Sequence, residues 1–321
     1  LDLSTTPTVE LMVKEYNADG GIIITASHNP TEWNALKLLD ENGEFLNSVE
    51  GEKIIDISES KKFIFSNVHE LGKIYKSNDS MKKHIECVLN LNLVDVEKIK
   101  SKKIKVVVDA VNSTGGLIVP DFLEELNIEV IKLYCEPNGD FPHNPEPLKK
   151  NLTELSKKVI ECNADLGIAV DPDVDRLVFV CEDGELFGEE NTLVACADYV
   201  LSKTPGSTVS NLSSSRALND ITKKHNQVHY YSAVGEVNVV DKMKKCKAVI
   251  GGEGNGGVIY PKSHYGRDSI VGIGLFLSLY VERGLIASKL LETYPKYFMV
   301  KEKINLSPSL DVDNILGQIA E

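Results

Sequence analysis

The sequence predicts an α/β fold in which consecutive domains each contain a mixed, mostly parallel sheet flanked by helices. Short β-branched runs alternate with longer amphipathic stretches, a pattern typical of strand–helix units. Several apolar runs also end directly in polar, glycine-rich or proline-bearing turns. Because ligands of open α/β sheets bind beyond the carboxyl ends of the strands, these turns are candidate sites. The runs are residues 21–24, 106–108, 166–170 and 248–250.

The length of 321 residues is enough for two or three domains. We place the boundaries at charged or turn-rich stretches, which gives domains at residues 1–97, 98–200 and 201–297. Residues 298–321 resemble the start of a fourth unit. Because the sequence does not begin with Met and the fourth unit does not complete, we expect a chain that is truncated at both ends.

Composition excludes several classes of protein. The formal net charge of -13 argues against a nucleic-acid partner, because phosphate backbones need a basic surface. No apolar run reaches the roughly 18 residues of a membrane helix, and the N-terminus lacks the pattern of a signal peptide. The 6 cysteines are scattered without a C-x-x-C pair, as in a reduced protein. We therefore expect a cytoplasmic monomer or homodimer with no membrane contact.

Residues 25–30 read Thr-Ala-Ser-His-Asn-Pro and are called the serine loop below. A serine in a turn after a buried strand is accessible, and neighbouring backbone N–H groups can hold a phosphate on Ser27. His28 and Lys37 could balance its charge or move protons. The alternative is that a polar residue of this loop only caps a helix starting after Pro30.

Residues 171–176 read Asp-Pro-Asp-Val-Asp-Arg and are called the aspartate loop. Alternate residues of an extended segment face one side, so Asp171, Asp173 and Asp175 are expected to converge. Three close carboxylates are costly without a cation, and oxygen ligands suit Mg²⁺. Arg176 could meet a phosphate oxygen with its guanidinium group. The alternative is a solvated acidic turn.

Three other functions of these loops are disfavoured. An EF-hand needs Gly where Arg176 stands, and residues 177–180 look like a strand. A phosphatase with Asp171 as nucleophile would leave the serine loop unexplained. A Ser-His-Asp hydrolase would need Ser27 and His28 to meet, although adjacent side chains normally point apart, and no G-x-S-x-G elbow surrounds them.

Residues 251–257 read Gly-Gly-Glu-Gly-Asn-Gly-Gly and are called the glycine loop. Its glycines let the backbone approach a ligand closely, and Glu253 and Asn255 could bond to sugar hydroxyls. It matches neither a dinucleotide turn nor a P-loop, and a mobile loop without a ligand is the alternative.

Three lesser features carry weaker expectations. Residues 112–116 could bind an anion at the start of a helix, but we expect them to cap the helix that follows them. Residues 232–236 form a loop candidate that includes Gly235 and Glu236. Arg267 is expected to pair with the neighbouring Asp268.

Taken together and in this order, the three loops resemble those of the α-D-phosphohexomutase family, and the resemblance spans essentially the whole chain. The serine loop matches T-A-S-H-N-P in full. The aspartate loop matches D-G-D-x-D-R with Pro172 in place of Gly. The glycine loop matches G-E-x-S-G-H in part, with Asn255 and Gly257 in place of Ser and His. The sequence around these loops is most similar to the bacterial phosphoglucosamine mutase branch of the family.

The resemblance implies a role for each candidate residue. The serine would carry the phosphoryl group, the aspartates would hold Mg²⁺ together with a phosphoserine oxygen, and the lysine would act as general acid/base. The arginine would contact the phosphate, and the remaining residues would bind or orient the sugar. The residues are Ser27, Lys37 and His28 for catalysis, Ser27, Asp171, Asp173 and Asp175 for the metal, and Arg176, Gly235, Glu236, Glu253 and Asn255 for the substrate.

The implied function is an isomerase that interconverts hexose 6-phosphate and 1-phosphate through phosphoserine and a bisphosphate. Glucosamine phosphate is the favoured substrate, and phosphomannomutase or phosphoglucomutase activity is the alternative. The R-x-S-G-T-E-P loop of the family's fourth domain does not occur in the sequence. A sugar-phosphate-binding fragment with little or no turnover is therefore a third possibility.

Overall fold

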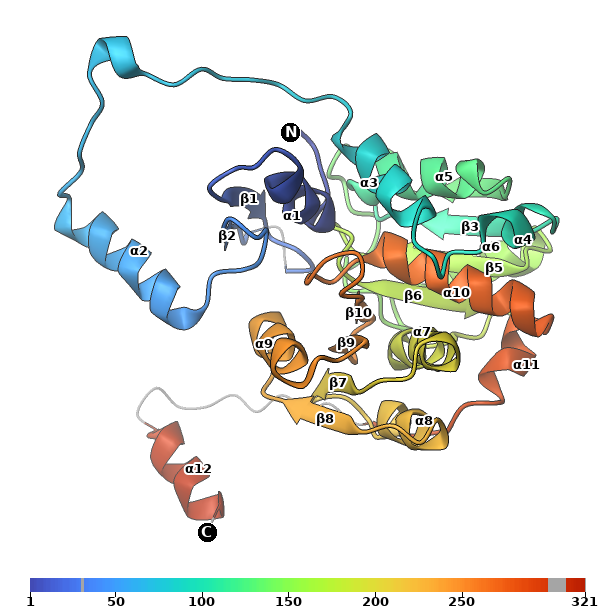
Figure 1. Ribbon diagram of the computed structural model, residues 1–321. Helices are drawn as coiled ribbons and strands as arrows, with labels where there is room; N and C mark the ends of the chain where they lie inside the picture. The colour runs from blue at the N-terminus through green and yellow to red at the C-terminus, as the bar shows by residue number, and fades with distance from the viewer. Residues whose placement is uncertain (30–31, 300–309, 321) are drawn as a thin grey trace.

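The computed structural model describes residues 1–29, 32–299 and 310–320, and it contains three sheets surrounded by helices (Figure 1). Pro30 of the serine loop and residues 300–309 of the expected fourth unit lie outside the described residues. The strands are β1 (Gly21–Thr25), β2 (Ala35–Leu39), β3 (Lys105–Asp109), β4 (Glu129–Leu133), β5 (Leu166–Val170), β6 (Leu177–Cys181), β7 (Thr208–Asn211), β8 (His229–Ser232), β9 (Ile250–Glu253) and β10 (Gly257–Ile259).

The helices connect and cover these strands. They are α1 (Thr6–Glu15), α2 (Ser48–Ser60), the short 3-10 helix η1 (Val68–Glu70), α3 (Ser80–Leu89), α4 (Val96–Lys100), α5 (Gly115–Glu125), α6 (Thr153–Glu161), α7 (Glu189–Lys203), α8 (Ala217–Lys224), α9 (Glu236–Cys246), α10 (Ser269–Arg283), α11 (Ala287–Leu291) and α12 (Val312–Ala320).

The two larger sheets confirm the predicted fold class. One has the order β4-β3-β5-β6 and the other β10-β9-β7-β8. In each, three strands are parallel, and the edge strand β6 or β10 is antiparallel. The first sheet differs, because its strands β1 and β2 form an antiparallel pair. The four apolar runs singled out in the sequence lie in or just before β1, β3, β5 and β9.

Helices cover both faces of the β3 sheet. Val106 and Val108 of β3 belong to the same buried cluster as residues of α5. Val107 instead packs in a second cluster with Leu155 and Val159 of α6. Because successive residues of a strand point to opposite faces, α5 and α6 lie on opposite sides of this sheet.

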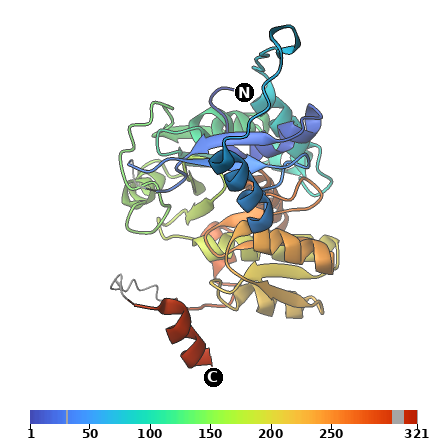
Figure 2. The ribbon, with the colours of Figure 1, turned by 90° about the vertical axis from the view of Figure 1, so that its left-hand side faces the viewer.

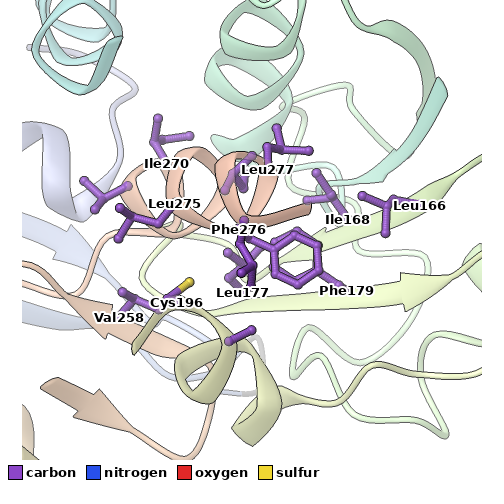
Figure 3. Close-up of a cluster of buried hydrophobic side chains, with 14 of the residues drawn as sticks. Leu166, Ile168, Leu177, Phe179, Cys196, Val258, Ile270, Leu275, Phe276 and Leu277 are labelled. Carbon is purple, nitrogen blue, oxygen red and sulfur yellow. The ribbon is translucent and has the colours of Figure 1, made fainter. Parts of the chain in front are cut away.

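One hydrophobic core joins the two larger sheets through α7 and α10. Figure 3 shows Phe276 of α10 against Phe179 of β6, with Leu177 beside them. The rings of Phe276 and Phe179 are stacked with centroids 3.8 Å apart, and Phe187 meets Phe276 edge-on at 5.1 Å. Val258 of β10 belongs to the same cluster. This shared core holds the strand ends of the two sheets in a defined relation to each other.

The segment between β2 and α3 packs less closely than the helices that cover the two larger sheets. Within the described chain, α2 has no buried side chain. In Figure 1, α2 and the chain that leads from it to α3 stand away from the larger sheets. In Figure 2, α2 lies in front of the body of the molecule, and the chain that follows it extends above the body. None of the helices that the structure describes is long and apolar enough to span a bilayer.

A buried polar network links α1 to the segment that precedes α10. Asp268 Oδ2 lies 2.9 Å from His84 Nε2 and 3.1 Å from His264 Nε2. His264 Nδ1 lies 3.2 Å from Glu10 Oε2, and His84 Nδ1 lies 2.8 Å from Thr8 Oγ1. All of these side chains are buried, so the network pins α1 against the C-terminal half of the molecule.

This network predicts a loss of stability at alkaline pH. Burial raises the pKa of Glu10 from 4.5 to about 8. Burial alone would lower the pKa of His264, but hydrogen bonds with Asp268 and Glu10 outweigh it and raise it from 6.5 to about 10. Both groups hold their protons more tightly in the folded chain, so the free energy of unfolding falls as the pH rises from about 4.5 to about 10, and most steeply from about 6.5 to about 8, where both groups contribute. Urea titrations across this range measure the slope.

The matched variant for this prediction is Glu10→Gln, which resembles the protonated carboxyl. Its free energy of unfolding should fall less steeply over the same range, because one of the two titrating groups is gone. Equal slopes for the two proteins would contradict the assignment to Glu10.

Candidate functional site

The serine loop follows β1 and places Ser27 against the aspartate loop. Ser27 has a φ of 50°, and its backbone N–H donates to Thr25 Oγ1 at 2.9 Å. Its Oγ donates to Asp171 Oδ2 at 3.2 Å and lies 3.3 Å from His28 Nδ1. The left-handed turn therefore aims the hydroxyl at a carboxylate 144 positions further along the chain.

One expectation about the serine loop is wrong, and so is the alternative interpretation of it. Ser27 and His28 do not point apart, because the left-handed conformation of Ser27 brings the neighbouring side chains together. The loop also does not cap a helix in the described chain. The next element is the strand β2, which begins at Ala35 and pairs back onto β1.

The aspartate loop gathers its three carboxylates by a tight turn. Asp171 Oδ1 accepts the backbone N–H groups of Asp175 at 3.0 Å and Arg176 at 3.1 Å, and Val174 has a φ of 66°. Asp171, Asp173 and Asp175 are buried, and their ligand atoms lie within 4.8 Å of one another. The predicted convergence is present, but the expected extended segment is wrong, because the chain folds back on Asp171.

Lys37 reaches the aspartate loop from β2. Its Nζ donates to Asp173 Oδ2 at 2.7 Å and to Asp175 Oδ2 at 3.1 Å. Asp173 Oδ2 also accepts the hydroxyl of Thr6 at 2.7 Å. Burial alone would lower the pKa of Lys37, but the charges of Asp175 and Asp173 outweigh it and raise the pKa above its usual range. In this arrangement Lys37 is a charged partner of the carboxylates.

Among the described residues, Arg176 has a side-chain N–H group that is free to bind an anion beside the serine loop. Its Nε is 4.0 Å from Asp171 Oδ2 and 3.9 Å from Asp175 Oδ1, and it makes no hydrogen bond to any described residue. Burial, and next the charge of Arg176, lower the pKa of His28. His28 is therefore neutral near pH 7 and able to accept a proton.

The carbonyl of Pro172 is held by two hydroxyl groups. Ser113 Oγ and Thr114 Oγ1 donate to it at 2.8 and 2.7 Å. The preceding Val111 has a φ of 46°, which is strained for a β-branched residue, whereas Asn112, with a φ of 52°, is of a type that tolerates this conformation. The expected capping of α5 is wrong, because neither hydroxyl caps that helix and both support the aspartate loop.

The glycine loop assembles the predicted substrate residues at the carboxyl end of β9. Glu253 Oε1 accepts the side chain of Asn211 at 2.7 Å and the backbone N–H of Gly235 at 3.2 Å. Asn255 Nδ2 lies 3.4 Å from Glu253 Oε2. Asn211 is the last residue of β7, the parallel neighbour of β9, and it was not among the predicted site residues. A polar residue at the carboxyl end of an apolar strand is the signal that could have identified it.

Arg267 connects the aspartate loop to the glycine loop. Its guanidinium donates to Asp175 Oδ2 at 2.8 Å, Glu236 Oε2 at 2.8 Å and Glu253 Oε2 at 2.9 Å. The expected pairing of Arg267 with Asp268 is wrong, because Asp268 instead accepts the first N–H groups of α10 and faces the buried histidines.

The charges of the site fit a divalent cation. Oδ1 of Asp173 and Oδ1 of Asp175 are buried and accept no hydrogen bond from the described part of the chain. Burial, and next the charges of Asp175 and Asp173, raise the pKa of Asp171 well above its usual range. Six carboxylates and three cationic side chains lie here, and hard divalent cations prefer such oxygen ligands. The charged groups counted are Asp171, Asp173, Asp175, Glu146, Glu236, Glu253, Lys37, Arg176 and Arg267.

A cavity of about 740 Å³ opens beside the serine loop. Ser27, Asn29, Thr114 and Asp173 are among its lining residues, but the glycine loop is not. The cavity therefore adjoins Ser27 and Asp173, while the residues predicted to bind the sugar are not among its lining residues.

Family models match most of the chain. They are described as phosphoglucomutase/phosphomannomutase, alpha/beta/alpha domain I, domain II and domain III, and they match residues 1–65, 82–184 and 189–297. The domain boundaries drawn from the sequence remain predictions.

Curated relatives and solved structures agree with these matches. A phosphoglucomutase/phosphomannomutase of Thermococcus kodakarensis is 35% identical over an alignment of 321 positions, which covers 99% of this chain and 69% of that protein. A phosphoglucosamine/phosphogalactosamine mutase of Sulfurisphaera tokodaii is 31% identical, and the alignment covers 99% of this chain and 71% of that protein. A family protein from Burkholderia thailandensis superposes with a TM-score of 0.74 at 25% identity, covering 87% of this chain and 59% of that one.

An Aspergillus fumigatus N-acetylphosphoglucosamine mutase, solved with GlcNAc-6P and magnesium, shares the fold with a TM-score of 0.57 at 14% identity, covering 90% of this chain and 76% of that one. This chain thus spans about two thirds of the length of its relatives. The identity to the Thermococcus protein and the three ordered domain matches confirm the predicted family. The chain belongs to the phosphoglucomutase/phosphomannomutase family, the α-D-phosphohexomutases, whose members are isomerases.

Proposed function

We propose that this chain is a phosphohexose mutase that transfers a phosphoryl group through Ser27. The contact between Ser27 Oγ and Asp171 Oδ2, at 3.2 Å, carries the proposal. It places a hydroxyl group at the edge of a buried carboxylate cluster that fits a divalent cation. A phosphoryl group on this oxygen would therefore adjoin both the metal and the guanidinium of Arg176.

The reaction consists of two balanced transfers. In the first transfer, the bond between Oγ of phosphorylated Ser27 and phosphorus breaks, and a bond from a sugar hydroxyl oxygen to phosphorus forms. The sugar hydroxyl gives its proton to a base, and Ser27 Oγ takes up a proton from an acid. The resulting bisphosphate turns over, and its other phosphoryl group returns to Ser27. His28, with Nδ1 3.3 Å from Oγ, is placed to accept the Ser27 proton when the serine is phosphorylated again. Lys37 is charged in this arrangement, so it is the second candidate for the acid that donates a proton. Bound Mg²⁺ supplies charge neutralisation of the transferring group.

The substrate residues complete the proposal. Arg176 would bind the phosphoryl group. Glu253, Asn255 and Glu236 would accept or donate hydrogen bonds to sugar hydroxyls, while the backbone N–H of Gly235 orients Glu253. The relative from Sulfurisphaera is described as acting on glucosamine and galactosamine phosphates, which supports glucosamine phosphate as the substrate. Phosphomannomutase or phosphoglucomutase activity is the alternative, and the proposed state is a monomer or homodimer.

Mass spectrometry of the chain after incubation with glucose 1,6-bisphosphate and Mg²⁺ tests the serine role. We expect one added phosphate on Ser27 and none on Ser27→Ala. The matched control is Ser60→Ala, which removes an exposed hydroxyl from the end of α2 and should leave labelling unchanged. A phosphate that persists in Ser27→Ala, or hydrolysis of the bisphosphate without labelled serine, would contradict the proposal and favour an aspartate nucleophile.

A further inference from the structure

Arg267 contacts three carboxylates that come from three different segments. The distances are 2.8 Å to Asp175, 2.8 Å to Glu236 and 2.9 Å to Glu253. Asp175 belongs to the aspartate loop, Glu236 begins α9, and Glu253 belongs to the glycine loop. A planar guanidinium has donors in fixed directions, so the positions of the three carboxylates depend on one another through this group.

The backbone at Arg267 is also held in place by contacts of its own. The backbone N–H of Arg267 donates to Glu236 Oε1 at 2.9 Å, and the residue forms a β-bridge with Ile259. The next residue, Asp268, accepts the N–H groups of Ile270 and Val271 and contacts two buried histidines. The side chain of Arg267 is therefore held in place, and it donates hydrogen bonds to both the aspartate loop and the glycine loop.

Gly257 gives the Arg267 side chain the space that it occupies. A Cβ atom at Gly257 would lie 2.3 Å from Cδ of Arg267 and 3.0 Å from its Cγ. Gly257 does not have the left-handed φ that favours glycine, so the requirement at this position is space alone. A methyl group here would displace the guanidinium without removing its charge.

We infer that Arg267 is a positioning residue that couples the aspartate loop to the glycine loop, and that Gly257 makes this coupling possible. The inference rests on the proposed function, because that function assigns the metal to one loop and the sugar to the other. A cation held by the three aspartates would withdraw negative charge from Asp175, the carboxylate whose Oδ2 accepts a hydrogen bond from Arg267. The guanidinium then pairs more strongly with Glu253 and Glu236 and holds them in place for the sugar. Each ligand therefore favours the other, by the same factor.

Hydrogen exchange of the full chain with Mg²⁺ alone tests the inference without any sugar or turnover. In the wild type, Mg²⁺ should slow exchange of the backbone amides in residues 171–176 and also in residues 251–257. We expect the second effect to be about 5-fold or more, the lower end of typical coupling between sites. Arg267→Lys keeps the charge but loses the fork of donors, so it should retain the first effect and lose the second.

Gly257→Ala is the second variant and should give the same result with the guanidinium intact, which decides the matter if Arg267→Lys does not fold. The control is Arg283→Lys, because Arg283 pairs with Asp198 at 3.0 Å and touches neither loop. A wild type that slows in residues 171–176 but not in 251–257, or variants that respond like the wild type, would overturn the inference and leave the proposed function standing. No slowing in residues 171–176 of the wild type would overturn the metal site and the inference together.

Discussion

Asp171→Asn is expected to weaken Mg²⁺ binding by about 100-fold or more, because even partners outside the first ring of ligands contribute 10–100-fold to metal affinity. The substitution removes one negative charge from the buried cluster. It preserves an oxygen that can accept the backbone N–H groups of Asp175 and Arg176 at 3.0 and 3.1 Å, so the turn should survive. Isothermal titration calorimetry with Mg²⁺ measures the affinity, and labelling of Ser27 by the bisphosphate should fall in parallel.

The matched control for this prediction is Asp183→Asn. Asp183 is exposed and accepts the backbone N–H of Glu185 in a turn after β6, so the variant makes the same chemical change outside the cluster. Its Mg²⁺ affinity should equal that of the wild type. A wild-type affinity in Asp171→Asn would show that the metal is held elsewhere.

Phe276→Ala is expected to have the largest effect on stability, a loss of about 3–5 kcal/mol in the free energy of unfolding. Phe276 is fully buried, stacks on Phe179 at 3.8 Å and meets Phe187 at 5.1 Å. Its removal leaves a cavity in the core that joins the two larger sheets. Because the aspartate loop and the glycine loop belong to different sheets, the geometry of the site should loosen as well. Urea denaturation followed by circular dichroism measures the loss.

The control for this prediction is Phe65→Ala, which removes the same ring from an exposed position in the segment before α3. Surface substitutions of this kind usually change stability by less than about 0.5 kcal/mol. A similar loss in the two variants would contradict the assignment of Phe276 to a tightly packed core.

The local parts of the site could be predicted from the sequence. The run that forms β1 and the serine loop after it are contiguous, as are the run that forms β5 and the aspartate loop. Alternation of apolar residues and turn chemistry act over a few residues, so they can be recognised in a single stretch. The convergence of Asp171, Asp173 and Asp175 also depended on neighbours in sequence, although a turn around Asp171 brings it about and not an extended strand.

The sequence by itself determined the fold class, the strand ends that bear the loops, and the residue types that suit phosphate, metal and sugar. Only the tertiary structure decided which charged groups meet. Arg267 was expected to pair with its neighbour but contacts Asp175, 92 positions away, and Lys37 reaches the same carboxylate from β2. A buried charge pairs with the opposite charge that the folded chain brings beside it, because leaving either one unpaired away from water is costly. That choice depends on the packing of the two sheets around α7 and α10, which no short stretch of sequence contains.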